Sequence, residues 1–381
     1  MRRSGLAALA TLVAATVCRG AEPTRSTLEL WAAHNQLAVL DPTSGTTTSL
    51  IAIDEVINGV AFSPDGSRAF VGTSGRDAVP DKKKQGAEAT TGGLYLIERG
   101  SKLAPRRITD GRIKEVHTSL DGKKLFALEW KVNAAPHDAS APKRPARRPE
   151  KEPFRLLTID LASTELRTVA SPLVGMDLYD FAVSPDQRTA VLLDPRHSSL
   201  RVFDLEKETP VETIPLAGGD AKDGSHRQAA LAKLAVSRDG ARVATLLNGG
   251  RRTGVLLFEL STRKRREALA PRGSQLRAGE FLPDGKSLVL LGIETLMLFD
   301  PEAGAVTRSV ELPEAFTALA LSPNGAEIAL GAPAALRTEG ARGGGLVEVW
   351  NVKDFTRRSR IALPMSVRVL EAAPPVADGA R

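Results

Sequence analysis

Apolar and polar positions alternate along much of the chain, and one short turn motif interrupts this alternation six times. The motif reads SPDG or a close variant, at 63–66, 119–122, 184–187, 237–240, 282–285 and 322–325. Alternation with a period of two predicts half-buried strands on both sides of each turn. Pro presets the first turn dihedral, Asp or Asn bonds to nearby backbone, and Gly adopts the positive φ that closes a tight hairpin. Each unit is therefore expected to open with a β-hairpin.

A second motif occurs seven times. It is an apolar strand that ends in an acidic residue or Asn and usually leads into a turn. The copies lie at 37–45, 94–101, 156–163, 200–207, 255–262, 296–304 and 347–354. Another short strand follows most of them, for example at 47–51, 305–310 and 358–362. Four short strands per unit, repeated around an axis, form the blade of a β-propeller.

The unequal numbers of the two motifs predict how the ring closes. The N-terminal unit, 28–50, lacks its opening strand, whereas the C-terminal segment 366–370 (SVRVL) is a strand without a unit. Pairing the two completes seven blades and removes the free sheet edges that invite aggregation. The alternative is an open stack of hairpins or a β-sandwich. We expect an all-β, seven-bladed propeller over 28–371, with a disordered tail at 372–381.

The repeats resemble the WD40-like and YVTN-type propellers of bacterial exported proteins, in which SPDG hairpins and a terminal V-x-V-x-D strand recur. The resemblance covers nearly all of 28–370 and implies the propeller fold. The Trp-Asp pair that ends eukaryotic WD40 repeats is absent, and Trp350-Asn351 is the nearest match. Because propellers host binding, scaffolding and several enzyme chemistries, the resemblance leaves the function open.

The N-terminus has the pattern of a secretory signal peptide. Met-Arg-Arg precedes a small-apolar run over 5–17, which predicts a signal peptide at 1–20 and a short linker at 21–27. We therefore expect an exported protein, periplasmic or extracellular. No later segment approaches the ~18 apolar residues that a membrane-spanning helix needs.

Cys18 is the only cysteine of the chain, so the predicted mature domain has no disulfide. Cys18 is also a candidate lipoprotein attachment site, which would tether the protein to a membrane. Val17 argues against lipidation, since a smaller residue is expected just before such a cysteine.

Charge and loop length indicate where a partner would bind. Long insertions at 74–93, 131–153, 218–229 and 332–345 fall on the face opposite the SPDG turns, and three of them belong to the second, third and seventh blades. Long loops on a rigid scaffold commonly carry binding, although loops also lengthen neutrally. The segment 131–153 is rich in Pro, Ala and basic residues and is predicted to be disordered or polyproline-like. The candidate binding residues are Lys82, Lys83, Lys84, Lys143, Arg144, Arg147, Arg148, Arg337 and Arg342.

These basic residues are typical of an arm that binds an acidic protein, an anionic envelope polymer or lipid headgroups, or alternatively of a solvated linker. Without Arg2, Arg3 and Arg19 the chain holds 52 − 3 = 49 basic and 45 acidic residues, a difference of +4. This balance and the scarcity of aromatic residues argue against nucleic-acid binding.

The sequence offers little for catalysis. The five histidines, at 34, 117, 137, 197 and 226, show no zinc-ligand spacing, so neither a metal nor a cofactor is predicted. His117 and Glu280 are weak candidates, because they replace the Ala that four other units carry at the equivalent place on the innermost strand: Ala61, Ala182, Ala235 and Ala320. The alternatives are polar side chains hydrogen-bonded within the ring, or a lactonase-type hydrolase centred in the channel, as in some propeller lactonases. Cooperation would require the two side chains to meet across the channel.

We therefore expect a monomeric, non-enzymatic binding or scaffold module. Its partner would contact the loop-rich face of the seventh, first, second and third blades.

Overall fold

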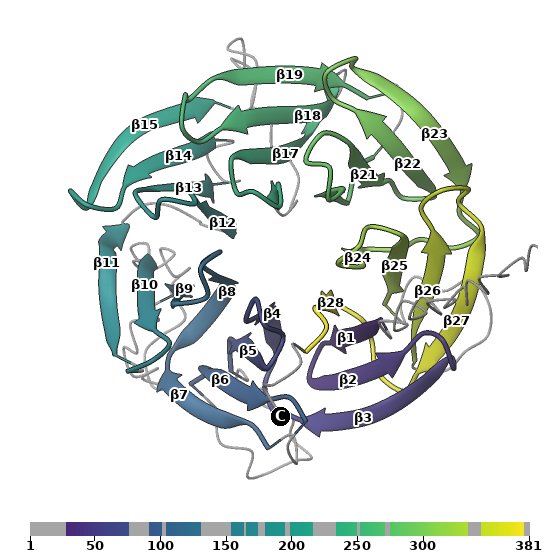
Figure 1. The fold of residues 1–381 in the computed structure, drawn as a ribbon, viewed down its shortest axis with the longest axis horizontal. Helices are drawn as coiled ribbons and strands as arrows, with labels where there is room; N and C mark the ends of the chain where they lie inside the picture. The colour runs from purple at the N-terminus through teal and green to yellow at the C-terminus, as the bar shows by residue number, and fades with distance from the viewer. Residues whose placement is uncertain are drawn as a thin grey trace, which may run out of the picture.

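The computed structural model describes residues 28–75, 91–100, 104–130, 154–163, 165–173, 180–194, 199–215, 234–249, 252–270, 275–333 and 344–376. Within these ranges the chain is all β: seven four-stranded antiparallel sheets stand as blades around a central axis (Figure 1). The predicted seven-bladed propeller is confirmed. No helix of the described residues is long and apolar enough to cross a membrane.

The strands of each blade are given from the axis outward (Figure 1). Blade A holds β28 (Val369–Ala373), β1 (Glu29–Ala33), β2 (Gln36–Asp41) and β3 (Thr46–Ala52). Blade B holds β4 (Ile57–Phe62), β5 (Arg68–Thr73), β6 (Gly93–Glu98) and β7 (Arg106–Asp110). Blade C holds β8 (Arg112–Thr118), β9 (Lys124–Trp130), β10 (Phe154–Asp160) and β11 (Leu166–Leu173).

The remaining four blades have the same order of strands. Blade D holds β12 (Asp180–Val183), β13 (Thr189–Asp194), β14 (Ser199–Asp204) and β15 (Thr209–Pro215). Blade E holds β16 (Ala235–Val236), β17 (Arg242–Gly249), β18 (Arg252–Glu259) and β19 (Arg265–Leu269). Blade F holds β20 (Ala278–Phe281), β21 (Leu288–Leu291), β22 (Thr295–Asp300) and β23 (Ala305–Glu311). Blade G holds β24 (Ala318–Leu321), β25 (Glu327–Ala332), β26 (Gly345–Asn351) and β27 (Arg357–Leu363).

The ring closes as the motif counts predict, with the C-terminal strand as the innermost strand of the first blade. β28 pairs antiparallel with β1, in a register that runs from Glu29 opposite Ala373 to Ala33 opposite Val369. This strand begins three residues beyond the predicted 366 and extends past the predicted domain boundary at 371. The apolar residue that shifted the prediction, Val367, is buried ahead of the strand beside Gly331. Its hydrophobicity therefore serves packing at the junction with blade G.

The SPDG turns have the predicted Asp and Gly conformations, and the Ser has a role as well. In blade B the Ser63 hydroxyl donates to Asp65 Oδ1 over 2.5 Å and accepts the Arg68 N–H over 3.0 Å. The hydroxyl thus joins the turn to the first residue of the next strand. Gly66 has a φ of 69°, which disfavours a side chain there. The same Ser bridge recurs at Ser119, Ser184, Ser237 and Ser322.

Neighbouring turns also pack against one another. A Cβ placed on Gly325 of blade G would lie 2.3 Å from Pro283 Cδ of blade F, so the proline of one turn occupies the space beside the glycine of the next. Blade A has no continuous turn at this place. There the carbonyls of Pro374 and Pro375 lie beside Gly66 instead. The residues after β28 thus complete the contact between blades A and B.

The core is distributed among the seven junctions between neighbouring blades. Each junction holds one cluster of buried apolar side chains from two adjacent sheets. Ala182, Ala235 and Ala320 are buried on the innermost strands, where the sheets converge. On the second and third strands, large fully buried side chains fill the widening gaps, among them Trp31, Phe70, Phe258 and Phe299. Packing of this kind holds the strand ends in fixed positions.

Candidate functional site

The alternating strand directions give the ring two different faces. The turn face carries the six SPDG-type turns. The loop face carries the connections from the second to the third strand of a blade and from the fourth strand to the next blade. The strand ends that flank the four long insertions lie on the loop face. Cys18 lies outside the described residues. So do the insertion residues proposed from the sequence, which are Lys82, Lys83, Lys84, Lys143, Arg144, Arg147, Arg148, Arg337 and Arg342.

His117 joins blade C to blade D. Its Nε2 lies 3.3 Å from Oδ1 of Asp180, and its ring meets that of Phe181 edge-on, with centroids 4.8 Å apart. Asp180 is buried and also accepts the N–H groups of Phe181 over 2.7 Å and Leu234 over 2.6 Å. A buried carboxylate requires such compensation, so this arrangement stabilises the inner ends of three blades.

Glu280, the other catalytic candidate, makes a comparable contact. On β20 of blade F, its Oε2 accepts the N–H of Leu321 on β24 of blade G over 3.0 Å. Blades D and E lie between the blades that carry His117 and Glu280 (Figure 1). The contacts seen for both side chains are thus to the following blade. Asn58 of blade B also contacts the following blade, since its Nδ2 donates to the carbonyl of Ile113 on β8 over 2.8 Å. The repeat pattern of the sequence did not single out Asn58.

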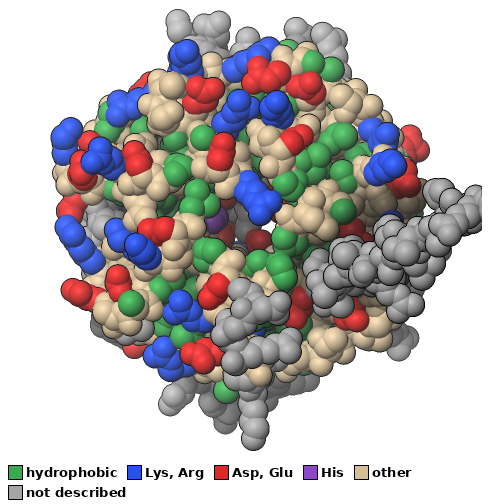
Figure 2. Space-filling model, in the orientation of Figure 1, with side chains coloured by type: hydrophobic (Ala, Val, Ile, Leu, Met, Phe, Trp, Pro, Cys, Tyr) green, Lys and Arg blue, Asp and Glu red, His purple; other side chains and the backbone are tan. Residues whose placement is uncertain are grey.

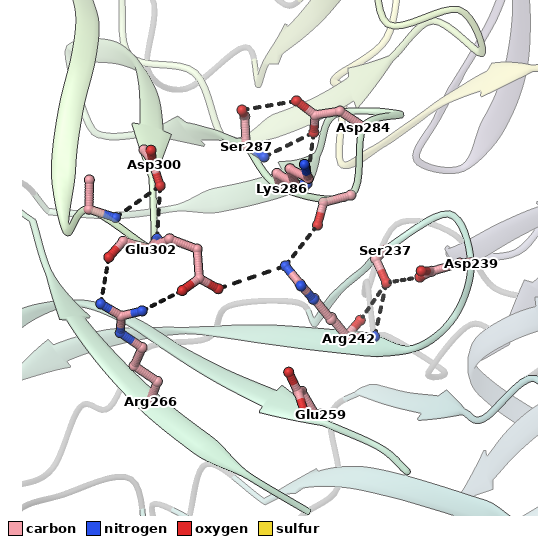
Figure 3. A network of polar contacts seen from close by, with 12 residues as sticks. Ser237, Asp239, Arg242, Glu259, Arg266, Asp284, Lys286, Ser287, Asp300 and Glu302 are labelled. Atoms are coloured by element: carbon pink, nitrogen blue, oxygen red, sulfur yellow. Dashed lines mark hydrogen bonds and ion pairs between the residues drawn. The ribbon is translucent and has the colours of Figure 1, made fainter. Parts of the chain in front are cut away.

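On the turn face, a polar network joins blades E and F (Figure 3). Glu302 lies between two arginines: Arg266 forms an ion pair with its carboxylate, and Arg242 Nη1 lies 3.9 Å from its Oε1. Arg242 also donates to the carbonyl of Gly285 over 3.3 Å. Both arginines are therefore engaged within the protein. On the face shown in Figure 2, Lys and Arg side chains are interspersed with Asp and Glu around a central opening.

Arginine and carboxylate are also paired inside blade G. Glu348 is fully buried, and it accepts hydrogen bonds from Trp350 Nε1 over 3.1 Å and from Arg357 Nη1 over 2.9 Å. Arg360 lies 3.7 Å from the same carboxylate and pairs with Glu314. Two partly exposed arginines thus compensate the negative charges of two buried carboxylates.

The loop face has a pocket of about 340 Å³ where blades F, G and A meet. Its residues come from five separate segments, at the β1–β2 hairpin, ahead of β20 and β24, after β25 and ahead of β28. They are His34, Arg277, Thr317, Pro333, Ser366, Val367 and Arg368. No sequence motif indicates this site, because ring closure brings together residues from both ends of the chain. Among the described residues no group of His, Cys, Asp and Glu could hold a metal ion.

Comparison with known proteins supports the architecture. No protein family matches the sequence, and no curated protein matches it. Among solved structures, a functionally unknown protein from Desulfotomaculum acetoxidans DSM 771 is similar with a TM-score of 0.63 and 10% identity, over 92% of this chain and 99% of that one. Hydrazine synthase from Kuenenia stuttgartiensis is similar with a TM-score of 0.55 and 13% identity, over 78% of this chain and 86% of that one. At these identities the likeness shows the propeller fold alone.

Proposed function

We propose that this protein is an exported, non-enzymatic binding or scaffold module that captures a partner protein on its loop face. The observation that carries this proposal is the difference between the two faces. The turn face consists of tight, mutually packed turns, and Arg242 and Arg266 are engaged by Glu302. The loop face combines the sites of the four long insertions with an open polar pocket at the junction of three blades. Rigid strands that present such loops are a common basis for binding.

Export is part of the proposal and rests on the signal-peptide pattern of residues 1–20. N-terminal sequencing of the protein from an envelope fraction tests it. A mature chain that starts near residue 21 supports export, whereas an intact N-terminus contradicts it. A Cys18→Ser variant that leaves the membrane fraction would show that the protein is a lipoprotein.

Affinity capture from envelope extracts, with the mature chain as bait, tests the binding role. We expect a specific partner that is lost when the basic segment 136–153 is deleted, with little change in the melting temperature, because that segment cannot bury a core. Replacement of the same segment by a neutral Gly-Ser linker of equal length is the matched control for its charge. The proposal is contradicted if no captured protein reaches saturation as the bait concentration is raised. A large loss of stability on deletion of 136–153 would show that this segment is packed against the ring.

One observation favours the alternative, a lactonase-type hydrolase centred in the channel. His117 leaves 35% of its side chain exposed while it contacts the buried carboxylate of Asp180. A general base oriented by a carboxylate has this arrangement. Hydrolysis of a panel of lactones, abolished by His117→Ala and reduced by Glu280→Gln, would establish the enzyme. Absence of turnover across the panel would exclude it.

A further inference from the structure

The pocket at the junction of blades F, G and A has two arginines in fixed positions. The backbone N–H of Arg368 donates to the carbonyl of Ala33 over 2.9 Å, and that of Arg277 donates to the carbonyl of Leu291 over 2.6 Å. These bonds anchor each arginine at the start of an innermost strand, beside the channel axis. Both side chains are exposed. Two guanidinium groups are thus presented from a rigid frame at the mouth of the ring.

Within the described ranges, neither Arg277 nor Arg368 forms an ion pair or a side-chain hydrogen bond. This distinguishes them from Arg242 and Arg266 on the turn face, which Glu302 engages. A guanidinium group remains charged throughout the accessible pH range, and its planar donors match the two oxygens of a carboxylate. The pocket therefore offers two guanidinium groups with which no described residue pairs.

The rest of the lining suits a carboxylate-bearing side chain. Thr317 adds a half-buried hydroxyl, His34 adds a half-buried imidazole, and Val367 and Pro333 provide apolar surface for the methylene groups of the side chain. A volume of about 340 Å³ accommodates one or two side chains. Enclosed sites for small molecules bury about 70–90% of the ligand surface. Because both arginines are exposed, this pocket fits groups that project from a larger partner better than it fits an isolated metabolite.

We propose that this site, the arginine pocket, binds Asp or Glu side chains from an acidic segment of a partner protein. Arg277 and Arg368 pair with the carboxylates, and the hydroxyl of Thr317 donates a further hydrogen bond. The inference rests on the proposed function, since it names the chemistry with which the partner is recognised on the loop face.

The first experiment measures binding of a fluorescently labelled, terminally blocked hexaglutamate to the full mature chain, with hexaglutamine as the neutral control. We expect hexaglutamate to bind and hexaglutamine not to bind. The affinity for hexaglutamate should fall as the salt concentration is raised. Each of Arg277→Gln and Arg368→Gln should weaken binding about 5-fold, since an exposed ion pair contributes up to about 1 kcal/mol. Arg238→Gln, which alters an exposed arginine on the turn face, is the matched control and should leave binding unchanged. Equal affinity for hexaglutamate and hexaglutamine would overturn the proposal. So would an unchanged affinity for hexaglutamate in the Arg277→Gln/Arg368→Gln double variant.

Two further arms separate the peptide from other occupants and the pocket from the wider function. Displacement of hexaglutamate by an equal concentration of inorganic phosphate would identify a site for small anions and overturn the peptide assignment. The Arg277→Gln/Arg368→Gln double variant is then used as bait in envelope extracts. Loss of capture supports the arginine pocket as the docking point. Unchanged capture overturns the pocket and leaves the proposed binding function in place.

Discussion

Arg99 donates a hydrogen bond from Nη1 to the carbonyl of Pro374 over 2.7 Å, although 275 residues separate the two in the sequence. The same guanidinium donates to the carbonyl of Gly66 over 2.5 Å and from Nε to Glu29 over 3.1 Å. It also lies 5.6 Å from the ring centroid of Phe62. A single side chain of blade B thus joins the first strand of the chain, the residues after its last strand and the first SPDG turn.

Replacement of Arg99 should weaken the ring at its closure. The Arg99 side chain is only 7% exposed, so Arg99→Ala leaves shielded carbonyls without a donor. We expect the free energy of unfolding to fall by about 2–3 kcal/mol in urea denaturation. Arg167→Ala, at a side chain that is 73% exposed, is the control and should change it by less than about 0.5 kcal/mol. Equal effects of the two substitutions would show that the Arg99 contacts contribute nothing to closure.

The packing between turns predicts different costs for two glycine substitutions. Gly304 and Gly325 have nearly the same φ, 64° and 67°, but only Gly325 has a neighbour, Pro283, in the space that a Cβ would fill. Gly304→Ala should cost about 1–2 kcal/mol from the backbone conformation. Gly325→Ala should cost about 1–3 kcal/mol more, because Pro283 must move. Equal losses in denaturation experiments would mean that contact between the turns of blades F and G does not stabilise the ring.

The SPDG turns should make the protein sensitive to acid. Hydrogen bonds lower the pKa of Asp65 below its ordinary value of 3.8, with the Ser63 hydroxyl as the largest cause. Ser hydroxyls have the same leading effect on the pKa values of Asp121, Asp186 and Asp239. Because the folded-state pKa values are depressed, the unfolded chain takes up protons first as the pH falls below about 5. The stabilisation is complete above that pH and is lost as the pH falls through the folded-state values.

The natural Asn324 shows how to test this dependence without destroying the turn, since it accepts the Ser322 hydroxyl over 2.7 Å and the Ala326 N–H over 3.0 Å. In a variant with Asn at all four Asp positions, the free energy of unfolding should change less between about pH 5 and pH 3 than in the natural chain. The single variant Asp65→Asn should show a smaller reduction of this pH dependence. An unchanged pH profile in the fourfold variant would exclude these carboxylates as the source of acid sensitivity.

The repeated motifs were sufficient to predict the architecture, because turn chemistry and strand alternation are local properties. The unmatched strands at the two ends even predicted the closure. The prediction failed by three residues at Val367, because alternation does not distinguish a strand from a buried residue that precedes one. The hydroxyl bridge of Ser63 was missed because its acceptor and donor become neighbours only after the turn has formed.

The arginine pocket could not be predicted at all from local patterns. His34 and Arg368 are distant in the sequence, and neither belongs to a motif. They line one cavity only because β28 pairs with β1. The candidates from the basic insertions, by contrast, came from composition, which indicates charge but not geometry.

Disulfide cross-linking tests closure of the ring most directly. In a Cys18→Ser background, Ala33→Cys and Val369→Cys place thiols on directly opposed residues of β1 and β28, at a separation that a disulfide can span. We predict rapid formation of an intramolecular disulfide in this pair, and little with Ala33→Cys and Leu370→Cys, since a shift of one residue turns the second side chain to the other face. Failure of the first pair to cross-link, or cross-links only between two molecules, would contradict a ring closed by its own last strand.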